Sequence, residues 1–514
     1  MPQPDVSCWY LCVAVVLEDL GMLWSSRDYA RTRQFFDDAL ALARRINNDS
    51  LVSHSLNRVG NWYLNDDKPA RATRFHNEAL QIFQAQGDIH GAAQTRDLLG
   101  MDHLILGDMV MSEHFFRQAI DDFAALGDRA GLCSTLASYA ATAGSDGFEH
   151  EAPAHVDRAT VEDAMQSALS LSVAIGWRAG EAYARCAIGA YQVVHGNYGL
   201  ALDSLQRANL IATEIEHRGW AAYALDSLGS VYVGLLDYDR ANQLSVRALD
   251  LAQAVGSRVH QRGALASLAT IHIEQGDVPG AIGLLETVVS RRRTPESTVE
   301  RWCLAIRAAA ALKTGEADLA LDIIDKLIQT APSASRSRPS PQVSKLHGQA
   351  FAALGRLPEA EAALTAAEAM ATDLGYLPVL WRITLSLGAL YKQWGRPEDA
   401  SRCFDAASAT IDRLAGTVTD ADLRACFMHS ASGVIQAARD QPRSSRRGSV
   451  GLTPRQCDVA IHIANGCSNA SIANQLHISV RTVEGHISGI MTTLDFASRA
   501  QIAAWAVRRG LVDI

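Results

Sequence analysis

Residues 228–256 read LGSVYVGLLDYDRANQLSVRALDLAQAVG, and residues 387–416 repeat the arrangement as LGALYKQWGRPEDASRCFDAASATIDRLAG. Each stretch opens with Leu and Gly, places a Tyr three positions after the Gly, and continues through a turn into an amphipathic segment. The amphipathic segments share small residues, because Ala241 and Ala248 match Ala400 and Ala407. Small residues at fixed places let two helices approach closely, so each stretch predicts a hairpin of two helices.

The small residue of the first helix recurs along the chain with a constant spacing. Positions 60 and 100, then 189, 229 and 269, then 348 and 388 are each 40 residues apart. This register predicts about ten hairpins between about residues 10 and 415, with weaker copies near residues 20, 140 and 308. Ala and Leu abound, and aromatic residues make up only 6% of the chain. We therefore expect an all-α protein in which residues 1–440 form a superhelix of hairpins.

Two segments interrupt this register. Residues 143–160 contain His150, Glu151 and His155, and residues 331–341 are rich in Pro and Ser. The two His residues do not have the spacing of ligands one helical turn apart. We therefore expect a solvated polar loop over residues 143–160 and no metal site.

The small and aromatic positions resemble those of the tetratricopeptide repeat, lengthened to about 40 residues by longer helices. Such an array presents a surface and does not house a particular chemistry. The resemblance implies a concave groove for an effector, which is an unknown protein, peptide or small molecule. A spacer or dimerisation frame without a ligand is the alternative interpretation.

Charge divides the chain into an acidic body and a basic tail. The net charge is −9, but residues 442–514 hold eight Arg and no Lys against four acids, which makes this tail +4. A basic appendage is typical of DNA binding. The nine cysteines are scattered without a C-x-x-C pair, which favours buried thiols in a reducing cytoplasm. The apolar stretch from Cys8 to Leu17 is too short to span a membrane, so no membrane partner is expected.

Residues 441–450 read as a flexible linker, and residues 451–514 show a compact pattern of four helices. The first opens at Pro454 after the N-cap Thr453, with Gln456 in place to close a capping box. Ser468 and Ser479 are suited to cap the next two helices. Two short helices joined by a tight turn form a helix-turn-helix, in which the second helix enters the major groove. In that helix Val483, Ile487, Ile490 and Leu494 have the spacing of a buried face.

The stretch LTPRQCDVAIHIANGCSNASIANQLHISVRTVEGHISGIMTTLDFASRAQIAAWAVRRGL, residues 452–511, resembles the LuxR/GerE DNA-binding domain from end to end. The resemblance rests on many positions in order, among them Thr453, Gly466, Ile472, Thr482, Val483 and Leu494. It implies a DNA-binding surface formed by Arg481, Thr482, Glu484, Gly485, Ser488 and Thr492. In this interpretation Glu484 and Ser488 contact base edges, Gly485 permits close backbone approach, and Arg481 and Thr482 lie against phosphates.

The resemblance also implies pairing through the last helix, Arg499 to Arg509, and hence a homodimer at least on DNA. This chain departs from many relatives, which have basic residues near Ser488 and at Thr492 and Thr493. Fewer cations release fewer counterions, so we expect weaker, less salt-sensitive binding by the isolated domain.

Superhelical repeats before such a domain resemble the C-terminal half of MalT-like regulators, whose N-terminal half binds nucleotide. No G-x-x-x-x-G-K-[ST] phosphate loop occurs in the sequence, so we expect no ATPase. Met1 directly precedes an apparent repeat helix, which suggests a natural short form or a start inside a longer gene. No catalytic site, cofactor or metal is predicted.

The sequence therefore predicts a cytoplasmic transcriptional regulator that binds double-stranded DNA. A repeat-based scaffold with a degenerate DNA-binding domain is the alternative. A quorum-sensing receptor or a phosphorylated response regulator is disfavoured, because each needs an α/β input domain.

Overall fold

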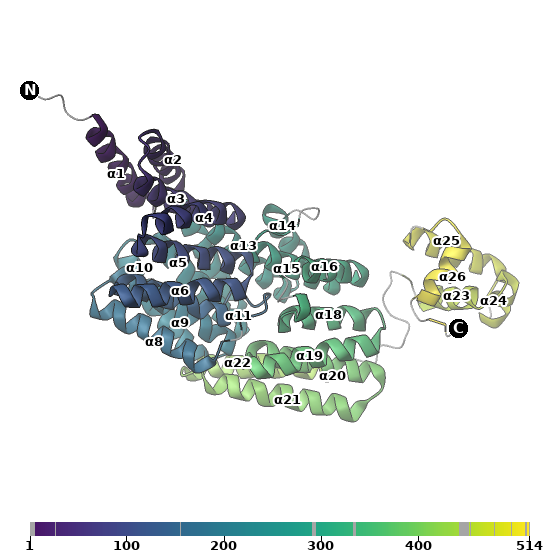
Figure 1. Ribbon diagram of the computed structural model, residues 1–514. Coiled ribbons are helices and arrows are strands. Elements are labelled where there is room, and N and C mark those ends of the chain that lie inside the picture. Colours follow the sequence, from purple (N-terminus) through teal and green to yellow (C-terminus); the bar gives the residue numbers. More distant parts are fainter. Residues whose placement is uncertain are drawn as a thin grey trace, which may run out of the picture.

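The computed structural model describes residues 6–25, 27–154, 156–289, 294–332, 336–440, 452, 454–476, 478–494, 496–508 and 511–512. These residues form helices and no strand, which confirms the all-α prediction. Figure 1 shows the hairpins stacked in order from α1 and α2 at one end of the repeats to α20, α21 and α22 at the other. The described helices up to α21 form ten hairpins, in agreement with the 40-residue register.

The helices of the first five hairpins are α1 (Val6–Trp24) with α2 (Tyr29–Arg45), α3 (Asp49–Asn65) with α4 (Pro69–Gln86), α5 (Ile89–Leu106) with α6 (Met109–Leu126), α7 (Arg129–Ala140) with α8 (Arg158–Ala174), and α9 (Arg178–His195) with α10 (Tyr198–Glu214). The next five are α11 (Arg218–Gly234) with α12 (Tyr238–Val255), α13 (Arg258–Gln275) with α14 (Val278–Val288), α15 (Thr298–Lys313) with α16 (Ala317–Thr330), α18 (Pro341–Ala353) with α19 (Leu357–Leu374), and α20 (Leu377–Trp394) with α21 (Pro397–Gly416). A further helix, α22 (Ala421–Asp440), follows the last hairpin.

The recurring small residue marks the closest approach of the two helices in a hairpin. A Cβ added at Gly100 would fall 2.5 Å from the Phe116 ring, and one at Gly388 would fall 2.6 Å from the Phe404 ring. Gly229 faces Ser245 in the same way. In each case the residue that packs against the glycine lies 16 positions later, so these three hairpins share the same internal spacing. A glycine on the first helix thus lets the second helix pack closely against it in these hairpins.

Residues far apart in the sequence meet across the superhelix. The Thr417 hydroxyl donates to the Gly196 carbonyl at 2.9 Å, and the Tyr198 amide donates to that hydroxyl at 3.1 Å. One core cluster accordingly joins residues of α9 to α12 with residues of α20 to α22, including Phe427. The hydroxyl of Tyr376, the residue just before α20, donates a hydrogen bond to the Ala143 carbonyl at 2.9 Å. The last hairpins therefore pack directly against the middle of the array.

The prediction of a solvated loop at residues 143–160 is wrong for residues 143–154, which are buried or half-buried, whereas residues 157–160 are exposed. Glu151 is 2% exposed and His150 is 8% exposed, and the Glu151 carboxylate pairs with Arg301 on α15. The Asp146 amide also donates to the Ala190 carbonyl on α9 at 3.1 Å. Residues 143–154 lie inside the superhelix, where Arg301 and the Ala190 carbonyl, both from other hairpins, bind two of their polar groups. His155 lies outside the described residues.

The C-terminal helices are α23 (Pro454–Ala464), α24 (Asn469–Leu476), α25 (Val480–Leu494) and α26 (Arg499–Arg508). They share one hydrophobic core that includes Val459, Ile472, Ile490 and Trp505. The predicted linker, residues 441–450, lies outside the described residues.

The cysteines only partly follow the expectation of buried thiols. Cys133, Cys186, Cys303 and Cys457 are buried, whereas Cys12 and Cys426 are exposed. Within the described ranges, no helix is long and apolar enough to cross a membrane. The same residues contain no group of three or more His, Cys, Asp or Glu side chains that could hold a metal ion.

Candidate functional site

The turn between α24 and α25 has the geometry of a helix-turn-helix. Ser468 caps α24, because its hydroxyl accepts from the Ser471 amide at 3.2 Å. Ser479 caps α25 in the same way, accepting from the Thr482 amide at 3.1 Å. Both caps confirm the sequence prediction and satisfy amides that lack a partner at a helix start. The Ile478 amide donates to the Ala473 carbonyl at 3.0 Å, which tightens the turn between the two helices.

One face of α25 is buried and the opposite face is open. Val483 and Ile490 are fully buried in the domain core, and Ile487 and Leu494 pack partly against it. The six predicted DNA-contacting residues are all exposed, namely Arg481, Thr482, Glu484, Gly485, Ser488 and Thr492. The predicted period thus brings these six residues, five of which carry a side chain, together on the outer side of one helix.

Local contacts constrain two of these side chains. The Thr482 hydroxyl shares a hydrogen bond with that of Ser479 at 2.7 Å, so it is held at the helix start. The Thr492 hydroxyl donates to the Ser488 carbonyl at 3.0 Å and is therefore partly occupied within the helix. Gly485 differs from Gly100 and Gly388, which pack against a ring, because a Cβ added at Gly485 would meet no atom within 4 Å. Packing inside the chain does not require glycine at this position.

Two arginines hold the helix-turn-helix to its flanking helices. Arg455 on α23 donates to the Leu476 carbonyl at the end of α24. Arg499 on α26 donates to the Asn469 side chain at 2.5 Å and also to the Cys467 carbonyl. These bonds fix the orientation of α24 from both sides. No local sequence pattern indicates these contacts, because each arginine binds a residue more than 20 positions away.

Gly489 marks a close crossing of two helices that the sequence did not indicate. A Cβ added there would fall 2.6 Å from the Gln456 amide nitrogen, so α23 and α25 cross closely at this point. Gln456 was expected to complete a capping box with Thr453, but Thr453 lies outside the described residues. The amide end of the Gln456 side chain lies next to Gly489.

Helix α26 turns Ile502, Trp505 and Ala506 into the core of the domain. Its opposite face exposes Ala500, Gln501 and Ala504. This face carries no charged side chain among the described residues of α26, apart from those at the two ends of the helix. The exposed middle of α26 is therefore neutral.

The C-terminal residues match a known protein family. Residues 450–506 match the family described as bacterial regulatory proteins, luxR family. This stretch is therefore a LuxR/GerE-type helix-turn-helix domain, as its residues predicted.

Known relatives are similar to the chain over the same region. YhcZ of Bacillus subtilis, a transcriptional regulatory protein, is 47% identical over 60 residues, which are 12% of this chain and 28% of that protein. Mb0914c of Mycobacterium bovis is 38% identical over 80 residues, 16% of this chain and 9% of that protein. The matches thus span less than a third of each of these relatives.

Among solved structures, a Rap protein complexed with competence and sporulation factor is similar in fold. It is 14% identical, with a TM-score of 0.48, and the match covers 80% of this chain and all of that one.

Proposed function

We propose that this chain is a DNA-binding transcriptional regulator whose α25 reads an operator in the major groove. The observation that carries the proposal is the exposed face of α25, on which all six predicted contact residues lie within a LuxR/GerE-type domain. In a helix-turn-helix the second helix enters the major groove, and its outer side chains contact base edges.

Each exposed residue has a role that fits its chemistry. Glu484 accepts from a cytosine amino group and Ser488 bonds to a base edge, so these two side chains read sequence. Arg481 and Thr482, at the start of α25, bind phosphates and fix the register of the domain on the duplex. The exposed glycine at position 485 leaves room for the DNA to approach the helix backbone. Thr492 lies further along the same face and contacts the backbone of the duplex.

The exposed face of α26 supports a homodimer on DNA. Pairing of two copies through this face places two α25 helices on two half-sites, so the operator is expected to be partly palindromic. In this proposal the repeats sense an effector, and effector binding changes how readily the two C-terminal domains span one operator. The proposal assigns the chain no catalytic activity and no cofactor, and it places the protein in the cytoplasm with the DNA.

Selection of genomic DNA fragments by the full-length protein tests this proposal. We expect wild type to enrich a partly palindromic motif and the variant Arg481→Ala, Glu484→Ala, Ser488→Ala to lose it. A matched control removes an exposed ion pair on α10, Asp203→Ala with Arg207→Ala, whose side chains lie 3.0 Å apart far from α25 in the sequence. This control is expected to enrich the same motif as wild type.

A repeat-based scaffold is the alternative function. It is favoured if neither wild type nor the control enriches any motif, with or without cell extract. In that case the search turns to protein partners of the repeats.

A further inference from the structure

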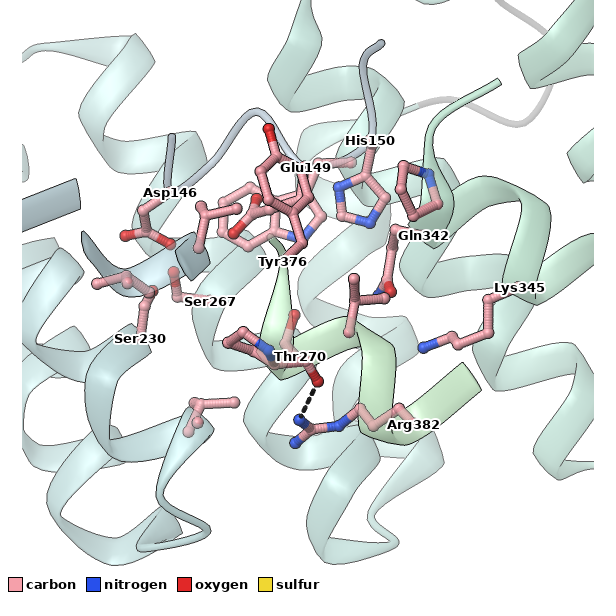
Figure 2. A pocket seen from close by; sticks show the side chains of 18 of the residues that line it. Asp146, Glu149, His150, Ser230, Ser267, Thr270, Gln342, Lys345, Tyr376 and Arg382 are labelled. Atoms are coloured by element: carbon pink, nitrogen blue, oxygen red, sulfur yellow. Dashed lines mark hydrogen bonds between the residues drawn. The ribbon is translucent and has the colours of Figure 1, made fainter. Parts of the chain in front are cut away.

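A cavity of about 190 Å³ opens on the inner side of the superhelix (Figure 2). Its wall is shared by α9, α10, α11, α13, α15, α18 and α20, together with the buried loop before α8. The loop is fixed here, because Glu151 pairs with Arg301 and Tyr376 binds the Ala143 carbonyl. The loop thereby occupies the inside of the superhelix and leaves a space of small-molecule size.

One side of the cavity is cationic. Lys345 on α18 is only 8% exposed, and its side chain extends toward the cavity in Figure 2. Among the described residues, none forms a hydrogen bond or an ion pair with the Lys345 ammonium. Arg382 on α20 lines the same side, where it donates to the Pro378 carbonyl at 3.1 Å and lies over the Trp381 ring. Two cations thus share one side of the cavity, and of the two Lys345 is buried, although a buried charge normally requires a partner of opposite sign.

The ammonium of Lys345 is nevertheless mostly charged near neutral pH. Burial, with a contribution from the Arg382 charge, lowers its pKa to about 8. The carboxylate of Glu274, at the rim, acts in the opposite direction but forms no ion pair with Lys345. The positive charge of Lys345 is therefore present and unmatched at pH 7.

The other side of the cavity is acidic. Asp146 and Glu149 come from the buried loop and lie across the cavity from Lys345 in Figure 2, near Ser230 and Ser267. Burial raises the pKa of Glu149 to about 8, and the negative charge of the nearby Asp146 contributes to this shift. Groups of this kind accept hydrogen bonds from an amine or a hydroxyl.

We propose that this cavity binds a small organic anion. Its carboxylate or phosphate lies between Lys345 and Arg382, and its other end offers an amine or a hydroxyl to Asp146 and Glu149. This inference names the chemical class of the effector in the regulator proposed above, and it rests on that function for its regulatory meaning only. The size of the cavity and the fixed loop favour a small molecule over an extended peptide.

Calorimetric titration of the full-length protein, without DNA and at constant ionic strength, tests the site. The probes are inorganic phosphate, propionate, 3-aminopropionate and 3-hydroxypropionate, with glycerol as the neutral control, each up to tens of millimolar. We expect at least one anion to bind wild type and glycerol not to bind. Lys345→Met should weaken anion binding about tenfold or more, as loss of a charged hydrogen bond does. Lys345→Arg should retain part of the affinity.

The control variant is Lys313→Met, which removes an exposed lysine at the end of α15. It should bind the anions as wild type does. Absence of binding by every anion, or equal binding by wild type and Lys345→Met, overturns the proposal.

3-Aminopropionate and 3-hydroxypropionate differ from propionate only by an amine or hydroxyl at the end away from the carboxylate, so they test the acidic side. Wild type should prefer one of them to propionate, and Glu149→Gln should reduce the preference. Equal binding of the three by wild type overturns the role assigned to the carboxyls. A protein that binds the anion but enriches no DNA motif keeps the site and refutes the regulator, so the two failures are distinguishable.

Discussion

Arg301 on α15 donates to the carboxylate of Glu151, a residue 150 positions earlier, and the two side chains are only 5% and 1% exposed. The guanidinium of Arg301 also donates to the Leu327 carbonyl at 3.1 Å. This buried pair fastens the loop before α8 to the inside of the superhelix. The loop in turn contributes Asp146, Glu149 and His150 to the cavity wall.

Removal of one member of this pair should destabilise the protein strongly. We expect Glu151→Gln to lower the free energy of unfolding by about 3–5 kcal/mol, because it leaves the Arg301 charge buried and uncompensated. Urea unfolding followed by circular dichroism measures the loss. The double variant Glu151→Leu with Arg301→Met should lose less than the single variant, since it leaves no charge behind. A loss below about 1 kcal/mol in the single variant would show that the pair is not buried in solution.

Replacement of Lys345 should have the opposite effect on the ligand-free protein. Lys345→Met removes a buried charge without a partner, so we expect it to gain about 2–3 kcal/mol of stability at pH 7. Because folding lowers the pKa of Lys345 to about 8 from 10.5, its penalty is fully present below pH 8 and disappears as the pH rises through 10.5. Thermal melts at pH 7 and pH 10.5 should therefore show the advantage of the variant shrinking. A variant less stable than wild type at pH 7 would contradict this prediction.

Glu149 should make stability depend on pH in the opposite sense. Folding raises its pKa to about 8 from 4.5, so its contribution is fully present below pH 4.5 and is lost as the pH rises through 8. Wild type should lose stability between pH 6.5 and 8.5, and Glu149→Gln should lose less over that range. Asp226, whose pKa burial raises to about 7, keeps part of the dependence in the variant. Identical pH profiles for the two proteins would exclude the effect.

Gly485 separates stability from DNA binding. Glycine inside a helix costs about 0.5–1 kcal/mol relative to alanine, and nothing lies near the added methyl group, so Gly485→Ala should raise the melting temperature. The same change should weaken binding to the selected DNA fragment, because it places a methyl group between the helix and the duplex. Gly433→Ala on α22 is the control, since it also has open space around the added Cβ. It should stabilise the helix without changing DNA affinity; an equal loss of affinity in both variants would contradict the role of Gly485.

Salt dependence should identify the phosphate contact of Arg481. The slope of log affinity against log salt should decrease in magnitude by about 1 in Arg481→Ala, because one fewer counterion is released. Fluorescence anisotropy with the selected fragment over a series of KCl concentrations measures the slope. Ser488→Ala should lower affinity and leave the slope unchanged. Equal slopes for wild type and Arg481→Ala would place Arg481 away from the phosphates.

Features that depend on local sequence could be predicted, and those that depend on distant contacts could not. Gly100 and Gly388 mark their hairpins because each packs against a residue 16 positions later, a distance that recurs at Gly60, Gly189, Gly229 and Gly348. The caps Ser468 and Ser479 and the outer face of α25 follow from helical period and hydrogen-bonding chemistry alone. The burial of Glu151 depends instead on Arg301, which no pattern around residue 151 could indicate. The cavity escaped prediction for the same reason, since its charged groups come from the loop, α18 and α20.

The Thr417 hydroxyl binds both the Gly196 carbonyl and the Tyr198 amide across the superhelix. This contact restricts how such an array can evolve. A solenoid whose repeats contact only their neighbours can gain or lose a unit by gene duplication or deletion, and the remaining units keep their contacts. Here every hairpin between α10 and α21 sets the distance from Gly196 to Thr417. An extra hairpin within that interval would carry Thr417 away from its partners. Homologues that keep this contact should therefore differ in hairpin number only outside it.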